Sequence, residues 1–524
     1  MQTRILSTLV LLILAISPLV ASAGPPNILF ILADDLGYGD VGCYNDEAKV
    51  ATPNLDRLAR EGMRFTDAHS ASTVCTPSRY SLLTGRMCFR TGYRGVFTGV
   101  GGPALIEEGR LTLPQMLRDH GYTTACIGKW HIGMTFLTKD GAPAHEARVP
   151  REAPADWREG GPALRQVQLV DFSRPIPDGP TTRGFDRFFG TACCPTTDWL
   201  YAFIDQDRVP TPPTKQLDRT PLPQHAYSRD NRRGMIAPDF DLEEVDLVFL
   251  EKSRQFLTEH VKQRPGRPFF LLHSMQAVHL PSFPARRFQG ETSAGPHGDF
   301  LHEMDHIVGQ LLKTLDDLGV ADDTLVMFGS DNGPEVTSVV NMRADHGHDG
   351  ARPWRGMKRD QWEGGHRTPF LVRWPGRVKP GSVSEQLLSL TDVMATCAAV
   401  VDADLPTGAA EDSYNFLPVL EGMQGERPVR EYLLEQTISL ALSIRRGPWK
   451  YLDHQGSGGN RYDRGELKQY ALPDAAPDAP GQLYNLADDP GETQNRYFER
   501  PEIVKELKAK LEAFKQSGRS APPR

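Results

Sequence analysis

Short apolar runs recur at wide separations along the chain, and each is hydrophobic without alternation. They lie at residues 27–33, 123–127, 268–274, 324–330 and 369–374. A strand that is buried on both faces needs apolar residues at successive positions, as in a mostly parallel sheet covered by helices. The runs therefore predict a large, mostly parallel sheet.

Helical signals lie between these runs. Thr52 and Pro53 can cap and open a helix that Gly62 closes. A longer helix is expected over residues 299–318, where apolar residues recur at helical spacing and Gly319 ends the pattern. Strands that alternate with helices in this way predict an α/β fold.

The pattern changes near residue 427. Beyond that point we expect a β-hairpin around Gly447-Pro448, a further strand, and a terminal helix over residues 501–515. We therefore expect a large domain at residues 24–426 and a smaller α+β domain at residues 427–524.

Two segments lack hydrophobic periodicity and are dominated by Pro, Gly and charged residues. They span residues 141–180 and 210–238. Loops of this length are uncommon in compact domains and are usually functional or mobile. We expect both segments to be long loops.

The first 23 residues have the pattern of an export signal. Arg4 precedes a mostly apolar run over residues 5–20, and Ala21-Ser22-Ala23 resembles a cleavage site. The run is shorter than the ~20 residues that span a bilayer comfortably. We expect a signal peptide at residues 1–23, a periplasmic or secreted mature chain, and no stable membrane insertion.

Composition narrows the possible partners. The chain has 524 residues, and its 59 Lys and Arg against 67 Asp and Glu give a formal charge of −8. This charge argues against a nucleic-acid partner held by general basicity.

The seven cysteines are too few for a disulfide scaffold, and their odd number leaves at least one outside any set of intramolecular pairs.

Acidic and amide side chains follow two of the predicted strands. Asp34 and Asp35 come directly after residues 27–33, and Asp331 and Asn332 come after residues 324–330. Ligands gather beyond the carboxyl ends of the strands in open α/β sheets. Hard oxygen donors suit Ca²⁺ or Mg²⁺. The alternative reading is that either pair only caps a strand or forms a turn.

Cys75 lies where a helix is expected to begin. Thr76 can cap a short helix that has Pro77 as its first residue and Gly85 as its stop, with Arg79 one turn on. The positive end of a helix lowers the pKa of a thiol and attracts anions. The alternative is an ordinary buried or disulfide-bonded cysteine.

Five motifs together resemble those of the type I sulfatases of the alkaline phosphatase superfamily, in which the motif cysteine becomes formylglycine. In family order they are Asp34-Asp35-Leu36-Gly37, Cys75-Thr76-Pro77-Ser78-Arg79, Gly128-Lys129-Trp130-His131, Ser330-Asp331-Asn332-Gly333 and Trp362-Glu363-Gly364-Gly365. The resemblance spans essentially the whole mature chain. It implies a large catalytic α/β domain and a smaller C-terminal sheet domain.

The resemblance implies a metal site and a modified nucleophile. A maturation enzyme would convert Cys75 to 3-oxoalanine (formylglycine). One divalent cation, most often Ca²⁺ with Mg²⁺ as an alternative, would bind an oxygen of that residue together with Asp34, Asp35, Asp331 and Asn332. A fixed cation is physically apt, because negative charge develops on the oxygens of a sulfate ester as its S–O bond breaks.

The resemblance also implies catalytic roles. A hydrated aldehyde at residue 75 offers two hydroxyls, one to attack sulfur and one to expel sulfate. Arg79 and Lys129 would position this group, and His131 would act as base in the second step. His279 and Lys358 would hold the sulfate and protonate the leaving oxygen.

These features predict an exported sulfuric ester hydrolase that acts on a sulfated carbohydrate, since residues 356–358 and 362–367, the long loops and the signal peptide resemble those of bacterial polysaccharide and glycosaminoglycan sulfatases. The alternatives are a broad arylsulfatase, a phosphate or phosphonate ester hydrolase of the same superfamily, and an inactive glycan-binding protein if Cys75 stays a thiol.

Two further histidine motifs have competing interpretations. His302-Glu303-Met304-Asp305-His306 matches the H-E-x-x-H zinc pattern. We interpret it as part of a sheet-covering helix because an apolar stripe accounts for that segment. His366 faces either the substrate or the protein interior.

Overall fold

The computed structural model describes residues 24–523. The predicted signal peptide at residues 1–23 lies outside the described residues. Within the described range, no helix combines the length and the apolar character needed to cross a membrane.

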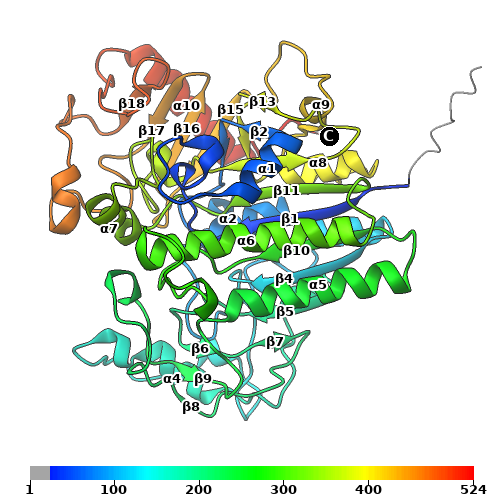
Figure 1. Ribbon diagram of the computed structural model, residues 1–524. Coiled ribbons are helices and arrows are strands. Elements are labelled where there is room, and N and C mark those ends of the chain that lie inside the picture. The colour runs from blue at the N-terminus through cyan, green and yellow to red at the C-terminus, as the bar shows by residue number, and fades with distance from the viewer. Residues whose placement is uncertain (1–23, 524) are drawn as a thin grey trace, which may run out of the picture.

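A nine-stranded sheet forms the centre of the large domain, in the order β13-β2-β12-β11-β1-β10-β4-β5-β7 (Figure 1). Its middle strands, β11, β1, β10, β4 and β5, all run parallel. Their bounds are Thr324–Ser330, Asn27–Ala33, Phe269–Ser274, Thr123–Lys129 and Arg187–Thr191. The predicted α/β fold with a mostly parallel sheet is therefore confirmed.

Shorter strands extend this sheet on both sides. β12 is antiparallel to both β11 and β2, and β7 is antiparallel to β5. These outer strands are β12 (Phe370–Arg373), β2 (Met63–Phe65), β13 (Ser382–Ser384) and β7 (Ile204–Asp205). Two small sheets accompany the large sheet. One consists of β3 (Ala68–His69) and β14 (Leu388–Ser389). The other consists of β6 (Leu200–Tyr201), β9 (Met235–Ile236) and β8 (Lys215–Gln216).

Two groups of helices cover the sheet. The long helices α5 (Val245–Gln263) and α6 (Gly295–Asp317) pack against each other, and α1 (Pro53–Glu61) packs on α6 (Figure 1). In the other group α2 (Cys75–Thr84), α3 (Leu113–Asp119) and α8 (Asp392–Val400) pack together. Both α3 and α5 contact β4, all of whose residues are buried. Continuous hydrophobicity in these strands thus follows from burial on both faces.

Three expectations about local structure need correction. Thr52 is the N-cap residue of α1, as expected, but its side chain makes no capping hydrogen bond, and its hydroxyl instead accepts a hydrogen bond from the backbone N–H of Gly42 at 2.8 Å. The long helix begins at Gly295 rather than near residue 299. The expected loop at residues 141–180 contains α4 (Pro162–Leu169), a helix too short for its two buried apolar positions to stand out as a period.

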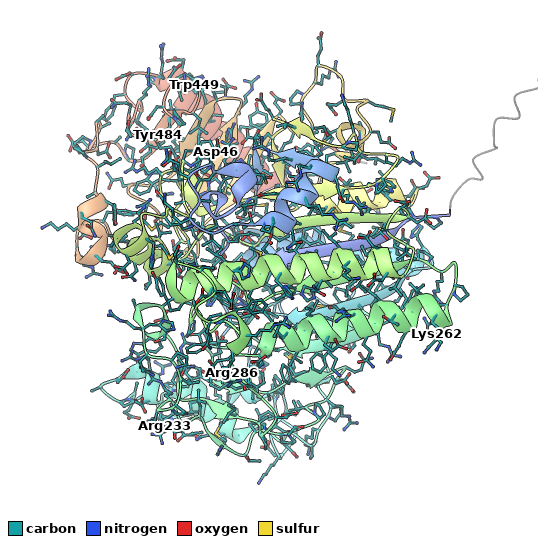
Figure 2. The ribbon with its side chains drawn as sticks, viewed as in Figure 1. Asp46, Arg233, Lys262, Arg286, Trp449 and Tyr484 are labelled. Atoms are coloured by element: carbon teal, nitrogen blue, oxygen red, sulfur yellow. The ribbon has the colours of Figure 1, made fainter. Side chains whose placement is uncertain are left out.

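The C-terminal part of the chain forms a separate four-stranded antiparallel sheet. Its strands in order are β15 (Tyr432–Gln436), β16 (Leu442–Arg446), β17 (Trp449–Leu452) and β18 (Gln482–Asn485). Of these, β16, β17 and β18 are the predicted hairpin and further strand, and β15 was not predicted. The terminal helix α10 (Pro501–Ser517) packs on β16 and β17. Figure 2 shows Trp449 and Tyr484 in this sheet, away from Lys262 on α5. The boundary at residue 426 stays a prediction. Two further helices, α7 (Val336–His346) and α9 (Leu417–Leu420), precede this sheet in the chain.

Strand register brings the motif residues together. Ala33 pairs with Ser330 between β1 and β11, and Ser274 pairs with Gly128 between β10 and β4. The residues that follow, among them Asp34 and Asp331, therefore emerge at the same edge of the sheet. The candidate site lies at this carboxyl edge.

Candidate active site

The acidic residues at the ends of β1 and β11 form one buried group. The backbone N–H of Asp35 donates to Oδ1 of Asp331 at 3.3 Å, and Nδ2 of Asn332 donates to Oδ1 of Asp35 at 2.7 Å. Oδ1 of Asp34 and Oδ1 of Asn332 are buried without a hydrogen-bond partner. Buried polar atoms are nearly always satisfied, so these two oxygens fit ligands of a hard cation.

Arg79 joins the acidic group to β4. Its Nε lies 2.8 Å from Oδ2 of Asp331 and its second terminal nitrogen lies 3.3 Å from Oδ2 of Asp34. The other terminal nitrogen donates to the carbonyl oxygen of Lys129 at 3.0 Å. Because the guanidinium is planar and donates in fixed directions, it holds both carboxylates in place.

Two buried lysines approach the acidic group, Lys129 from the end of β4 and Lys358 from a turn between α7 and β12. Nζ of Lys129 pairs with Oδ2 of Asp34, and Nζ of Lys358 lies 2.7 Å from Oδ2 of Asp35. Lys358 also lies 3.5 Å from Glu335. Burial by itself lowers the pKa of an ammonium, but the paired carboxylates leave the pKa of both lysines raised. Both side chains are therefore cationic at neutral pH.

The carboxyls of Asp331 and Asp34 have opposite pKa shifts. Burial and the charge of Asp34 raise the pKa of Asp331 well above its ordinary value. Burial also works to raise the pKa of Asp34, but Lys129 and other cations leave it lowered. The two carboxyls therefore lie close enough for the charge of one to oppose ionisation of the other.

Cys75 is the first residue of α2 and is 2% exposed. Burial alone raises the pKa of its thiol, but hydrogen bonds with Cys194 and His131 and the charge of Lys129 lower it well below the ordinary value. Thr76 was expected to cap this helix, and that expectation is wrong. Its hydroxyl donates instead to the carbonyl oxygen of His131 at 2.8 Å.

His131 presents one ring nitrogen to the site. Its Nε2 lies 2.7 Å from the carbonyl oxygen of Phe97, so Nε2 carries the proton and Nδ1 is free to accept one. Nδ1 lies 3.8 Å from Sγ of Cys194. The positive φ of 58° at His131 turns the chain sharply after Lys129. The ring therefore presents Nδ1 to the site.

His279 lies at the outer side of the site. Its Nδ1 is 2.5 Å from the carbonyl oxygen of Leu280, and its Nε2 is 3.7 Å from Oδ2 of Asp35. Its side chain is 11% exposed, more than the 6% of Lys358. Burial and the charge of Lys358 lower its pKa. His279 is therefore placed to meet a group that enters from solvent.

The structure brings all the predicted site residues together. They are Asp34, Asp35, Cys75, Arg79, Lys129, His131, His279, Asp331, Asn332 and Lys358. Their assigned roles stay predictions. Sequence reasoning missed Cys194 and also Glu335, which pairs with both Lys358 and Arg359. Each of the seven cysteines is a free thiol.

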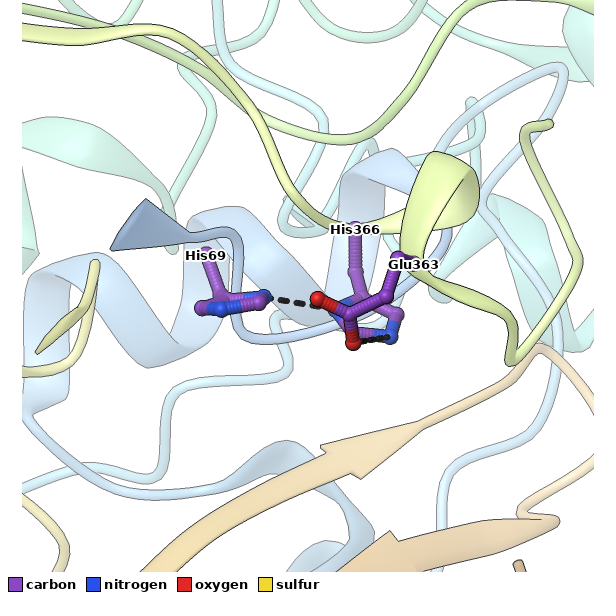
Figure 3. A group of neighbouring side chains, drawn as sticks. All are labelled: His69, Glu363 and His366. Carbon is purple, nitrogen blue, oxygen red and sulfur yellow. Dashed lines mark hydrogen bonds and ion pairs between the residues drawn. The ribbon is translucent and has the colours of Figure 1, made fainter. Parts of the chain in front are cut away.

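A second buried cluster lies between the large domain and the C-terminal sheet (Figure 3). Nδ1 of His366 lies 2.9 Å from Nδ1 of His69, and its Nε2 lies 3.9 Å from Oε1 of Glu363. Nζ of Lys450, on β17, lies 2.9 Å from the same Glu363 oxygen and 3.2 Å from Nε2 of His366. An ammonium thus stands where a metal ion would bind, and His366 has a structural role.

The H-E-x-x-H segment also has a structural role. It lies within α6, where Oε2 of Glu303 accepts a hydrogen bond from the backbone N–H of Ala285 at 2.7 Å. The rings of His302 and His306 pack on Phe288.

A cavity of about 570 Å³ lies between the segment around Trp362 and the C-terminal sheet, and the residues that line it do not include those of the candidate site. Nδ2 of Asn460, which lines it, donates to the carbonyl oxygen of Lys358 at 2.8 Å. Other residues that line it include Arg355, Gln455, Arg461, Tyr462 and Tyr484. Arginine, amide and aromatic side chains in one cavity suit a polar ligand.

Comparison with known proteins gives concordant results. The family described as Sulfatase matches residues 26–403. An N-acetylgalactosamine-6-O-sulfatase of Bacteroides thetaiotaomicron is 32% identical over 502 residues, which cover 94% of this chain and 93% of that protein. Arylsulfatase A of Homo sapiens is 32% identical over 95% of this chain and 89% of its own length.

Solved structures agree with the sequence comparison. One structure, described with the metabolism of multiple glycosaminoglycans by Bacteroides thetaiotaomicron, has a TM-score of 0.78 and 31% identity and covers 94% of this chain and 100% of that chain. The structure of Ps i-CgsB with k-i-k-neocarrahexaose, at 20% identity and a TM-score of 0.67, shares the fold.

Proposed function

The chain belongs to the sulfatase family and hydrolyses sulfate esters, and we propose that its substrate is a sulfated carbohydrate. We propose further that Cys75 is converted to formylglycine and that one divalent cation, Ca²⁺ or Mg²⁺, completes the site. One observation carries the proposal: residue 75 opens its helix beside a base, His131, and beside an acidic group that retains unpartnered oxygens.

The cation would be held by the oxygens of Asp34, Asp35, Asp331 and Asn332, together with residue 75. When bound, a divalent cation stabilises negative charge on the oxygens of a sulfate group. Formylglycine in its hydrated form supplies a nucleophilic hydroxyl and a second hydroxyl that allows sulfate to be released. Residue 75 and the donors fit these groups, because the carboxylates converge on the N-terminus of α2.

His131 supports this chemistry as a proton acceptor. Its Nε2–H is held by the carbonyl of Phe97, so the Nδ1 lone pair stays directed toward residue 75. The fixed tautomer removes the need for the ring to reorient when a proton is taken. Rigid orientation of a base lowers the entropic part of the barrier.

Lys129, Lys358 and His279 bind and polarise the sulfate group. The ammonium of Lys129 pairs with Asp34 and that of Lys358 pairs with Asp35. Both cations therefore lie near the place where negative charge would develop on the sulfate group. His279 stands at the more exposed side, and its lowered pKa makes the protonated ring a strong acid. An anionic ester beside it favours that protonated form, which then protonates the leaving oxygen.

The carbohydrate assignment is supported by two features. The relative from Bacteroides thetaiotaomicron is a sulfatase of N-acetylgalactosamine. The cavity lined by Asn460, whose amide contacts the backbone of Lys358, offers Arg355, Arg461 and Tyr484, side chains of the kind that bind hydroxyl and anionic groups of sugars. We propose that sugar units next to the sulfated residue occupy this cavity.

A sulfate-release screen tests the proposal. The converted enzyme is given defined sulfated mono- and oligosaccharides, including 6-sulfated N-acetylgalactosamine, beside an aryl sulfate and an aryl phosphate. We expect the largest kcat/KM on a carbohydrate. A largest kcat/KM on the aryl sulfate would favour the arylsulfatase alternative, which the similarity to arylsulfatase A supports. A larger value on the phosphate would overturn the proposed chemistry.

The formylglycine is tested separately by peptide mass analysis of the segment around residue 75 after co-expression with a maturation enzyme. An aldehyde is expected, and a persistent thiol in a fully active protein would overturn the proposed nucleophile.

We also propose that the protein is exported to the periplasm or secreted, on the basis of residues 1–23. Fractionation of the native host detects the mature chain outside the cytoplasm if this holds.

A further inference from the structure

A second thiol lies against the residue that carries the nucleophile. Cys194 follows β5, is buried, and shares a side-chain hydrogen bond with Cys75. Its Sγ also lies 3.8 Å from Nδ1 of His131 and 3.7 Å from Nε2 of His279. Cys194 thus contacts residue 75 and both histidines of the site.

The neighbouring Cys193 has partly different surroundings. Its sulfur lies against the backbone of Gly101, where an added Cβ would meet Sγ at 2.9 Å. Sγ of Cys193 also lies within 4.8 Å of a ring nitrogen of His131 and a carboxylate oxygen of Asp198. The side-chain hydrogen bond with residue 75 belongs to Cys194. Cys194 is therefore the thiol that contacts residue 75, and Cys193 is a control from the same loop that also lies near His131.

Thiols add reversibly to aldehydes, and this site provides the parts for such an addition. We propose that Cys194 adds to the formylglycine aldehyde at residue 75 and holds the resting enzyme as an internal thiohemiacetal. This inference rests on the proposed conversion of Cys75. It makes residue 75 the covalent partner of Cys194 in a thiol–aldehyde adduct. The proposed hydrolytic mechanism gives Cys194 no role.

The addition balances without any oxidant or reductant. The Cys194 thiol gives its proton to Nδ1 of His131, which is free because Nε2 donates to Phe97. The sulfur lone pair forms an S–C bond with the aldehyde carbon as the C=O π pair moves onto oxygen. That oxygen takes the proton from His131, so no atom is gained or lost, and the reverse steps regenerate thiol and aldehyde.

Proximity favours the adduct over the same reaction between free molecules, because both groups are held on rigid elements. The adduct carries one hydroxyl where the hydrated aldehyde carries two, so it cannot perform the sulfate-release step. The adduct is therefore a protected resting form, and hydration must displace Cys194 before turnover.

Carbon NMR of the converted holoenzyme tests the inference. Protein is labelled with cysteine enriched in ¹³C at the β-carbon, so that the labelled carbon of residue 75 becomes the formyl carbon. In the wild type we expect this resonance in the region of a carbon bonded to one sulfur and one oxygen. In Cys194→Ser and Cys194→Ala we expect it to shift to the region of a carbon bonded to two oxygens, and Cys193→Ala should leave it unchanged.

Each outcome decides the inference. A wild-type resonance typical of the hydrated aldehyde overturns it and leaves the proposed function intact. A resonance typical of an unmodified cysteine overturns both the inference and the proposed conversion of Cys75. Loss of the sulfur-bonded signal in Cys193→Ala, with retention in the Cys194 variants, overturns the assignment to Cys194. The nearly isosteric Cys194→Ser variant serves if the alanine variant does not fold.

Discussion

The ammonium of Lys358 lies 2.7 Å from Oδ2 of Asp35, although the two residues are 323 positions apart in the chain. Glu335 holds the same ammonium from its other side at 3.5 Å. This pairing fixes a cation beside the predicted metal ligands. The cation comes from a turn far along the chain from β1, the strand that Asp35 follows.

Removing this cation should slow turnover. We expect Lys358→Ala to lower kcat/KM by about 10²–10³-fold, the usual effect of losing one group that stabilises developing charge. Lys379→Ala, at an exposed position, is the control and should match the wild type. A Lys358→Ala enzyme within about threefold of wild type would show that the ammonium does not meet the sulfate group.

A divalent cation should raise thermal stability through Asn332. Ligands that bind only the folded state stabilise it by about 2.7 kcal/mol at a concentration of 100 Kd. We expect chelation to lower the Tm and abolish sulfate release, and added Ca²⁺ to restore both. Asn332→Ala should lose most of the Ca²⁺-dependent rise in Tm, whereas Asn341→Ala should retain it. Equal rises in both variants would remove Asn332 from the ligand set.

Stability should fall with rising pH because of Asp246, a buried residue of α5 that accepts a hydrogen bond from the backbone of Gln276. Burial raises its pKa from 3.8 to about 7, and the charge of Asp34 adds to the effect. Burial also raises the pKa of Glu303 on α6, which interacts with Asp246, and no cation of the described residues lowers the pKa of Asp246.

A folded-state pKa above the unfolded value means that the fold binds the proton. The resulting stabilisation is complete below pH 3.8 and is lost as the pH rises to about 7. The loss amounts to about 1.4 kcal/mol for each pH unit within that window. In chemical denaturation, Asp246→Asn should show a weaker decline between pH 5 and pH 7 than wild type or the exposed-site control Asp239→Asn. Parallel declines in all three proteins would contradict the assignment.

The buried cluster of Figure 3 should depend on Lys450. Its ammonium lies 2.9 Å from Glu363 and 2.9 Å from Glu492, and all three side chains are buried. Removing one partner of a buried ion pair leaves the other uncompensated, at a cost of about 3–5 kcal/mol. We expect Lys450→Met to lose stability on this scale in urea unfolding. Lys508 is half-exposed, and Lys508→Met should change the free energy of unfolding by less than about 1 kcal/mol. A similarly small loss in Lys450→Met would show that Lys450 does not stabilise the cluster.

The sequence predicts the middle of the fold well because burial leaves a strong signal there. β1 and β11 begin and end where their apolar runs do. β5 was missed because only two aromatic residues mark it, and its partner β7 is two residues long. Strands of this kind are set by pairing with neighbours rather than by their own pattern.

The site shows the same division. Residues that follow long parallel strands, such as Asp34 and Asp331, could be placed together from the sequence, because strand register fixes where they emerge. Cys194 could not, since its position depends on how the chain folds after β5 and on the turn that brings His279 beside it. Local pattern carries no information about such contacts across more than 80 residues.

The burial of Cys75 sets an order of events in the life of the chain. Its side chain is 2% exposed and lies among His131, Lys129 and a second thiol, Cys194. A separate enzyme cannot reach a side chain in that position, so any conversion to formylglycine must occur while α2 is still unpacked. Rapid folding would therefore compete with maturation, and a slower-folding chain would be modified more completely.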